Sequence, residues 1–134
     1  MKTSKQLVGD RGEQEACNFL IGEGHRILRR NWRTGHLELD IISICGNVLH
    51  IVEVKTRSAG APVRPEFNVG HYKRRRMVQA AGDFLHSDSA HSLPPVEEVL
   101  FDVLSVEFGQ DGPNIEYYPS AFIPVYTGGQ LNFR

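Results

Sequence analysis

The sequence is poor in several features that define whole classes of proteins. Among its 134 residues it has only 2 cysteines and 1 tryptophan. No apolar run comes near the roughly 20 residues that a membrane-spanning helix needs, and the first residues lack the apolar core of a signal peptide. Cys17 and Cys45 have no second cysteine or histidine at zinc-binding spacing, so a structural zinc site is not expected. We therefore expect a soluble, cytoplasmic protein without a membrane partner.

An excess of charge of one sign is also missing. The chain has 15 Lys and Arg residues against 16 Asp and Glu residues, which gives a net charge of −1. The positive charge is nevertheless gathered in two stretches, from Arg26 to Arg33 and from Lys73 to Arg76. Local patches, rather than the total charge, decide whether a polyanion binds. A nucleic-acid partner is therefore compatible with the composition.

The periodicity of the apolar residues predicts one α/β domain. Helices are predicted at 7–23 and from about 68–70 to 86, and strands at 26–33, 37–45, 48–57, 99–108 and, more briefly, 115–118. The order αβββαβ, with the short final strand, predicts a mixed central β-sheet flanked by helices. The second helix supplies the long crossover that a parallel strand pair requires. We expect the domain to span residues 1–118 and residues 119–134 to form a C-terminal tail.

The central hairpin allows a strand register to be predicted. A two-residue turn at 46–47 places Asp40 directly opposite Glu53 and Glu38 directly opposite Lys55. The same register gathers apolar side chains of the first strand on one face: Leu39, Ile41 and Cys45. A slip by one residue would mix the faces, so the register is internally consistent.

The two opposed pairs have different consequences. Glu38 and Lys55 are expected to form a supporting ion pair across the strands. Asp40 and Glu53 repel each other at this distance, so the pair either shares a proton or holds a cation. Carboxylates without nearby histidine or cysteine favour Mg²⁺ or Mn²⁺. A buried structural ion network is the alternative interpretation.

The order of the charged residues along the chain matches a known pattern. A glutamate in the first helix, an aspartate on one strand and Glu-x-Lys on the next are present as Glu13, Asp40, Glu53 and Lys55. This set resembles the PD-(D/E)XK nuclease superfamily and, more closely, the YraN-like family of small bacterial predicted endonucleases. Further matching stretches extend to about residue 106: Gly12 with Ala16, Arg30–Arg33, Glu38–Ile42, Val52–Arg57, Lys73 with Ala80, Ala81 and Leu85, and Phe101–Val103. One departure is Leu37, where the family usually has glycine.

The resemblance implies a restriction-endonuclease-like fold and metal-dependent hydrolysis of phosphodiester bonds. The implied substrate is structured, branched or single-stranded DNA, which is favoured over RNA. The implied metal ligands are Asp40, Glu53 and the carbonyl of Val54, with Mg²⁺ or Mn²⁺ as the cofactor. Lys55 would orient the attacking water and offset developing charge, and Glu13 would stand in the outer surroundings of the metal.

The resemblance also implies a nucleic-acid surface. Arg33, Arg57 and Lys73 would neutralise backbone phosphates without reading the base sequence. Two copies would suit a two-stranded substrate, so a homodimer stays open, with the aromatic tail as a candidate interface. The alternative function is a non-catalytic nucleic-acid-binding protein that retains the nuclease fold. A third hypothesis is an interaction protein whose charged cluster is structural.

Overall fold

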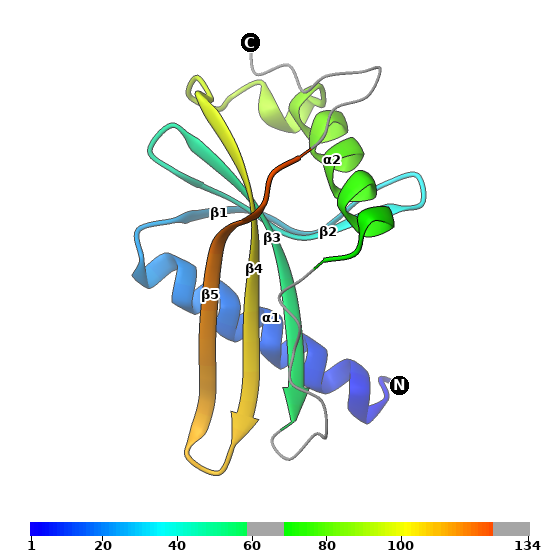
Figure 1. The fold of residues 1–134 in the computed structure, drawn as a ribbon, viewed down its shortest axis with the longest axis vertical. Helices are drawn as coiled ribbons and strands as arrows, with labels where there is room; N and C mark the ends of the chain where they lie inside the picture. The colour runs from blue at the N-terminus through cyan, green and yellow to red at the C-terminus, as the bar shows by residue number, and fades with distance from the viewer. Residues whose placement is uncertain (59–68, 125–134) are drawn as a thin grey trace.

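The computed structural model describes residues 1–58 and 69–124, and its elements follow the predicted order (Figure 1). Two helices, a short 3₁₀ helix and five strands are described: α1 (Ser4–Gly22), β1 (Arg26–Thr34), β2 (Leu37–Cys45), β3 (Val48–Ser58), α2 (His71–Leu85), η1 (Asp88–Ala90), β4 (Glu98–Gly109) and β5 (Gly112–Phe122). The strands form one sheet in the order β1-β2-β3-β4-β5, with β3 and β4 parallel and the other pairs antiparallel. The predicted mixed sheet flanked by helices is confirmed.

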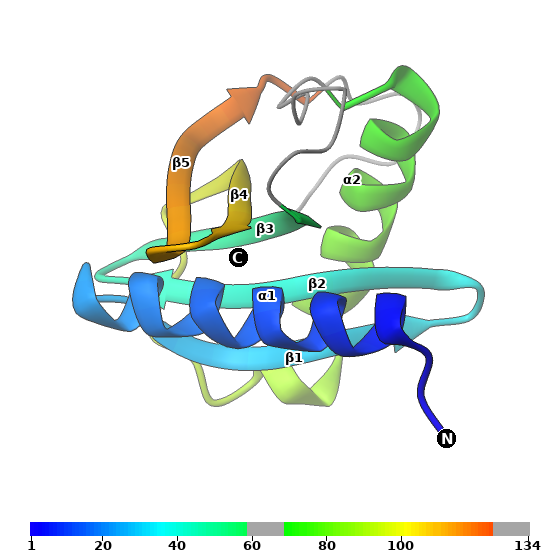
Figure 2. The same ribbon diagram turned by 90° about the horizontal axis from the view of Figure 1, so that it is seen from below.

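The two long helices pack on opposite faces of the sheet and bury separate apolar clusters (Figure 2). The cluster on the α1 face contains Ala16, Cys17, Leu20, Ile41, Val52, Leu104 and Val106. The larger cluster on the α2 face includes Met77, Ala80, Ala81, Phe84, Ile42, Ile44, Leu49, Ile51, Phe101 and Val103. Each helix therefore buries one apolar face against the sheet. In the described ranges, no helix has the length and apolar character needed to cross a membrane.

Helix α1 begins earlier than the apolar pattern predicted. The Thr3 hydroxyl accepts a hydrogen bond from the Gln6 backbone N–H at 3.1 Å, and the Gln6 side chain accepts one from the Thr3 N–H at 2.8 Å. This reciprocal capping box satisfies two backbone donors at the start of the helix. The extra residues bring Lys5 into the folded part of the chain.

The predicted hairpin register between β2 and β3 is confirmed. Cys45 pairs with Val48, and the same count continues along the ladder to the pair Ile41 and Val52. Gly46 adopts φ +61°, a backbone conformation that glycine enters without steric cost. The paired ladder stops at Ile41 and Val52, immediately before Asp40 and Glu53.

The last strand is longer than predicted. β5 continues to Phe122, whose ring stacks on Phe101 with the centroids 5.2 Å apart. Residues 119–122 therefore belong to the sheet rather than to the tail. The rest of the proposed tail interface, from residue 125 onward, lies outside the described residues.

A buried polar network lies on the α1 face, near the hairpin turn. The Asp102 carboxylate is fully buried; its Oδ2 accepts a hydrogen bond from Tyr117 Oη at 2.5 Å and lies 2.6 Å from His50 Nδ1. His25 Nδ1 lies 2.9 Å from Ser43 Oγ, and the His25 and His50 rings are 4.4 Å apart. Burial, followed by the charge of His50, lowers the pKa of His25. The network joins residues of β2, β3, β4 and β5 to His25, the residue directly before β1.

Candidate functional site

Asp40 and Glu53 meet where the paired part of the hairpin ends. Glu53 is only 6% exposed, and a side-chain hydrogen bond joins the two carboxyl groups. Burial, then this hydrogen bond and the negative charge of Glu53, raises the pKa of Asp40 well above its usual range. The two groups therefore share a proton when nothing else neutralises them, as expected for carboxylates that cannot both be ionised.

The position of Asp40 depends on a break in the alternation of β2. Leu39 packs in the cluster on the α2 face, whereas Ile41 packs in the cluster on the α1 face. The prediction that both share one face is wrong. Asn31, which neighbours this point from β1, has φ +50°, and Asp40 Oδ2 accepts the Val54 N–H at 2.9 Å. The aspartate consequently lies in the seam between β2 and β3.

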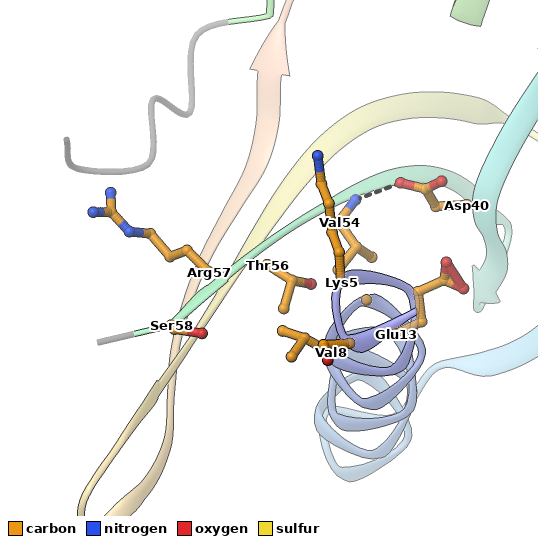
Figure 3. A pocket seen from close by; sticks show the side chains of 10 residues that line it. Lys5, Val8, Glu13, Asp40, Val54, Thr56, Arg57 and Ser58 are labelled. Atoms are coloured by element: carbon orange, nitrogen blue, oxygen red, sulfur yellow. Dashed lines mark hydrogen bonds between the residues drawn. The ribbon is translucent and has the colours of Figure 1, made fainter. Parts of the chain in front are cut away.

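A cavity opens where the first half of α1 passes the end of β3. Its volume is about 540 Å³, and it is lined by Ser4, Lys5, Val8, Gly9, Glu13, Asp40, Val54, Thr56, Arg57 and Ser58. Figure 3 shows the carboxylates of Glu13 and Asp40 at the same end of this cavity, while Arg57 extends at the other end. Helix α1 and the β2–β3 seam thus bring acidic groups from two elements to one wall.

The Glu13 side chain lines the cavity from α1. Burial raises the pKa of its carboxyl group, and this effect outweighs the contact with the Asn31 side chain and the charge of Arg30, which lower it. Its Oε2 is buried without a hydrogen-bond partner. A buried carboxylate oxygen without a donor is costly unless a ligand supplies positive charge or a proton.

Lys73 of α2 contacts the carboxylate pair. Its ammonium group forms an ion pair with Glu53 Oε2, with the lysine side chain 56% exposed and that of Glu53 8% exposed. Burial lowers the pKa of Lys73, but the hydrogen bond and charge of Glu53 outweigh it, so the net pKa is raised. Lys73 therefore neutralises Glu53 from the rim of the site. Its predicted contact with phosphate stays a prediction.

The predicted ion pair between Glu38 and Lys55 is absent. Glu38 instead pairs with Arg33, directly opposite it on β1, at 3.0 Å. The reason is that the β2–β3 ladder ends before these residues, so Glu38 is aligned with β1 and not with β3. Lys55 is half-buried and has no ion-pair partner within the described ranges. Arg57 lines the cavity.

The donors at this site fit a hard divalent cation with few protein ligands. Across residues 1–58 and 69–124, no three His, Cys, Asp or Glu side chains gather closely enough to form a metal-binding group. Mg²⁺ commonly uses only one or two carboxylates and keeps several waters. Asp40 and Glu53 satisfy that requirement, because a cation between them would neutralise two carboxyl groups that resist being ionised together.

Sequence reasoning missed several residues that shape the site. Lys5, Thr56 and Ser58 line the cavity, and Gly12 lies against Thr56. The capping-box pattern of Thr3 and Gln6 was a signal for extending α1, and a glycine inside a predicted helix was a signal for close approach. Neither signal identifies the partner on β3.

Comparisons with known proteins agree on one family. The model described as "Uncharacterised protein family UPF0102" matches residues 12–106. A UPF0102 protein of Anaeromyxobacter dehalogenans is 40% identical over 118 residues, covering 88% of this chain and 85% of that protein. One of Nitratidesulfovibrio vulgaris is 43% identical over 136 residues, covering 100% and 98%. One of Bacteroides thetaiotaomicron is 40% identical over 119 residues, covering 87% and 93%.

A solved structure is also similar, at a greater distance. The structure of Pyrococcus furiosus SfsA in complex with Ca²⁺ matches with a TM-score of 0.40 and 18% sequence identity. The match covers 84% of this chain, and the chain spans 62% of the length of that one. Similarity at this level carries no argument about function.

Proposed function

The chain belongs to the UPF0102 family, the one that its sequence resembles under the name YraN-like, and we propose that it is a metal-dependent endonuclease. The observation that carries the proposal is the Asp40–Glu53 pair, two buried carboxyl groups too close to be ionised together. Glu13, on α1, lines the same cavity as Asp40, and Lys55 follows Glu53 by two residues on β3. The proposed substrate is nucleic acid, with DNA favoured over RNA.

Asp40 and Glu53, with the carbonyl of Val54, would hold Mg²⁺ or Mn²⁺. The chemistry that such an ion supplies is activation of a water nucleophile and neutralisation of charge on the scissile phosphate. Asp40 is held in place because one of its oxygens accepts the Val54 N–H. This leaves its second oxygen for the cation, whereas Glu53 would exchange its ion pair with Lys73 for the cation.

The remaining residues bind and orient the substrate. Lys55, half-buried and without an ion-pair partner in the described ranges, is suited to orient a water and to offset charge that develops on the phosphate. Lys5 and Arg57 line the cavity next to the carboxylates and would contact flanking phosphates. Glu13 would accept a hydrogen bond from water at the inner wall.

We expect cleavage that requires Mg²⁺ or Mn²⁺ and depends on Asp40 and Lys55. Single-stranded, duplex and four-way-junction DNA, and single-stranded RNA, are incubated with the purified protein in each metal and in EDTA. Asp40→Asn and Lys55→Ala are expected to be at least about 100-fold slower than the wild type, because each removes a group that acts on the transition state. Asp40→Asn also loses metal binding, which Lys55→Ala retains.

Glu98→Gln is the matched control, since it removes an exposed carboxylate at the opposite end of the β3–β4 pair. Circular dichroism checks that each variant is folded. Cleavage that persists in both site variants would place the activity elsewhere or in a contaminant. Binding without cleavage in every metal would favour the non-catalytic alternative. That alternative is supported by the partners that the two carboxylates already have, Lys73 for Glu53 and the Val54 N–H for Asp40.

A divalent ion must compete with the Lys73 ammonium group for Glu53. Lys73→Met is therefore expected to raise the affinity for Mn²⁺ by about 5-fold or more, because a buried carboxylate is left without its cation. Isothermal titration calorimetry measures this without any need for activity. Arg75→Met, which removes the same charge from a neighbouring exposed position, should change the affinity by less than about 2-fold. Unchanged or weaker Mn²⁺ binding by Lys73→Met would contradict the assignment.

A further inference from the structure

Two basic segments that are far apart in the sequence meet at one end of the molecule. Arg76 Nη2 on α2 donates a hydrogen bond to the His36 carbonyl in the β1–β2 turn at 2.8 Å. Thr34 Oγ1 donates to Asp83 Oδ2 at 3.0 Å, which ties the same helix to the end of β1. Arg33, in the adjacent position on β1, has a side chain that is 74% exposed. The first turns of α2 and the β1–β2 turn therefore form one surface that carries Arg33, Lys73 and Arg76, of which Arg33 is paired with Glu38 and Lys73 with Glu53.

An exposed aromatic ring stands within this surface. Tyr72 is 67% exposed, one of few large apolar side chains left in water in the described part of the chain. The Arg76 guanidinium lies over its ring, 5.4 Å from the centroid, and Arg76 Nη1 also donates to the Tyr72 hydroxyl at 3.4 Å. One face of the ring is thus held by a cation–π contact, which fixes its orientation. The other face is available for stacking.

The Tyr72 ring belongs to the turn of α2 that also supplies the contact with Glu53. Lys73, the next residue, reaches inward to Glu53, while Tyr72 and Arg76 share the side of α2 that meets the β1–β2 turn. A strand whose phosphate lies at Asp40 and Glu53 would pass this turn of α2. The cations Arg33, Lys73 and Arg76 would follow its backbone.

We propose that Tyr72 is a stacking platform for an unpaired base, so that the preferred substrate carries a single-stranded segment next to the scissile bond. This rests on the proposed nuclease function and specifies its substrate class. Stacking of a base on an aromatic side chain contributes about 1–3 kcal/mol and requires an open base face. A base inside a duplex has both faces covered by its neighbours. Only the base pairs at the two ends of a duplex have an open face. Tyr72 is accordingly a positioning residue that favours single strands over duplex.

The charge around the ring favours nucleic acid over a protein partner. Arg33, Lys73 and Arg76 lie in the same region, whereas apolar protein interfaces are depleted of charge at their centre. Arg76 also donates a hydrogen bond to the His36 backbone carbonyl, so its side chain is held in place before any ligand binds. The alternative occupant of this surface is a second copy of the chain, and the experiment must distinguish it from nucleic acid.

The test is the binding of labelled oligothymidine and of a blunt duplex of equal length, in EDTA, by fluorescence anisotropy at about 50 mM salt, where phosphate contacts are strong. Tyr72→Ala is expected to weaken single-strand binding by about 5- to 100-fold and duplex binding by less than 2-fold. Tyr72→Phe keeps the ring and should bind like the wild type. Ile123→Ala removes another exposed apolar side chain (84% exposed) and serves as the matched control.

A second readout reports stacking directly. In Tyr72→Trp, the emission of the new indole should be quenched by oligothymidine, whereas the wild type, whose single tryptophan is Trp32, should show no such quenching. Equal weakening of single-strand and duplex binding by Tyr72→Ala, or no weakening, would overturn the proposal. Loss of self-association in Tyr72→Ala without a change in oligonucleotide binding would overturn it in favour of a homodimer contact. A wild type that binds neither oligonucleotide would instead remove the proposed function itself.

Discussion

Asp102→Ala is expected to lower the free energy of unfolding by about 3–5 kcal/mol, because it removes the shared acceptor of several polar groups, each of which costs about 1–3 kcal/mol when it is buried and left unsatisfied. The Asp102 carboxylate accepts the Tyr117 hydroxyl at 2.5 Å and the Ser120 N–H at 2.9 Å, and it lies 2.6 Å from His50 Nδ1. Alanine leaves these three polar groups without their acceptor. The loss is a large share of the 5–15 kcal/mol that typically separates the folded from the unfolded state.

The expected effect also has a location. Ser120 has φ +52°, an unusual backbone conformation for a residue other than glycine, and its N–H is held by Asp102. Without that contact the end of β5, including the stacking of Phe122 on Phe101, should open first. Urea denaturation gives the free energy, and hydrogen exchange should show faster exchange in β5 near Ser120 than in β2.

Graded variants make this result interpretable. Asp102→Asn keeps the side-chain volume and one acceptor oxygen. It replaces the second oxygen with an NH2 group that faces other donors. We therefore expect an intermediate loss of about 1–3 kcal/mol in the free energy of unfolding. Asp111→Asn, in the exposed β4–β5 turn, removes the same charge and should change stability by less than about 0.5 kcal/mol. An Asp102→Ala variant as stable as Asp111→Asn would show that the network contributes nothing to folding.

The parts of the fold that depend on local pattern were predictable from the sequence. Period-2 alternation and the Gly46 turn fixed the pairing of Ile41 with Val52, because a slip would exchange the buried faces. The stripe that contains Met77 and Phe84 followed from helical spacing in the same way. The same register brings Asp40 and Glu53 to adjacent positions just beyond the last ladder pair, so the amino-acid pattern predicts that they are near each other but not the break at Asp40.

The parts that depend on a third element were not predictable. Glu38 was assigned to Lys55 because only the β2–β3 hairpin was considered, whereas the register of β1 places Arg33 opposite it. The break at Asp40 lies beside Asn31 on β1, and no repeat in β2 itself announces it. The metal-binding and catalytic roles of Asp40 and Lys55 likewise stay predictions, since they depend on ligands and not on the chain alone.

The buried network was also beyond sequence reasoning. The pairing of β3, β4 and β5 brings Asp102 to His50 and Tyr117. His25, the last residue before β1, contacts the His50 ring. No local spacing links these residues, so each looked like a separate core or surface position. Their closeness follows only from the order of the strands in the sheet.

Gly12→Ala is expected to destabilise the protein by about 3 kcal/mol or more, although alanine is the better helix former. A Cβ atom on Gly12 would lie 2.0 Å from Thr56 Oγ1, 2.6 Å from Cγ2 and 2.8 Å from Cβ. Rotation of the threonine cannot relieve the overlap, because its Cβ is itself too close. The gain of about 1 kcal/mol in helix propensity is smaller than this cost, so α1 must move away from β3.

The displacement would also reach the site, because Glu13 is the next residue on α1. Gly12→Ala should therefore weaken Mn²⁺ binding as well as folding, measured by calorimetry and by urea denaturation. Gly9→Ala, on the same helix with nothing within 4 Å of the new Cβ, should instead be neutral or stabilising. Adding Thr56→Ala to Gly12→Ala removes two of the three overlapping atoms and should restore part of both losses, a coupling of about 0.5–3 kcal/mol. If Gly12→Ala behaves like Gly9→Ala, the close packing of α1 on β3 does not position Glu13.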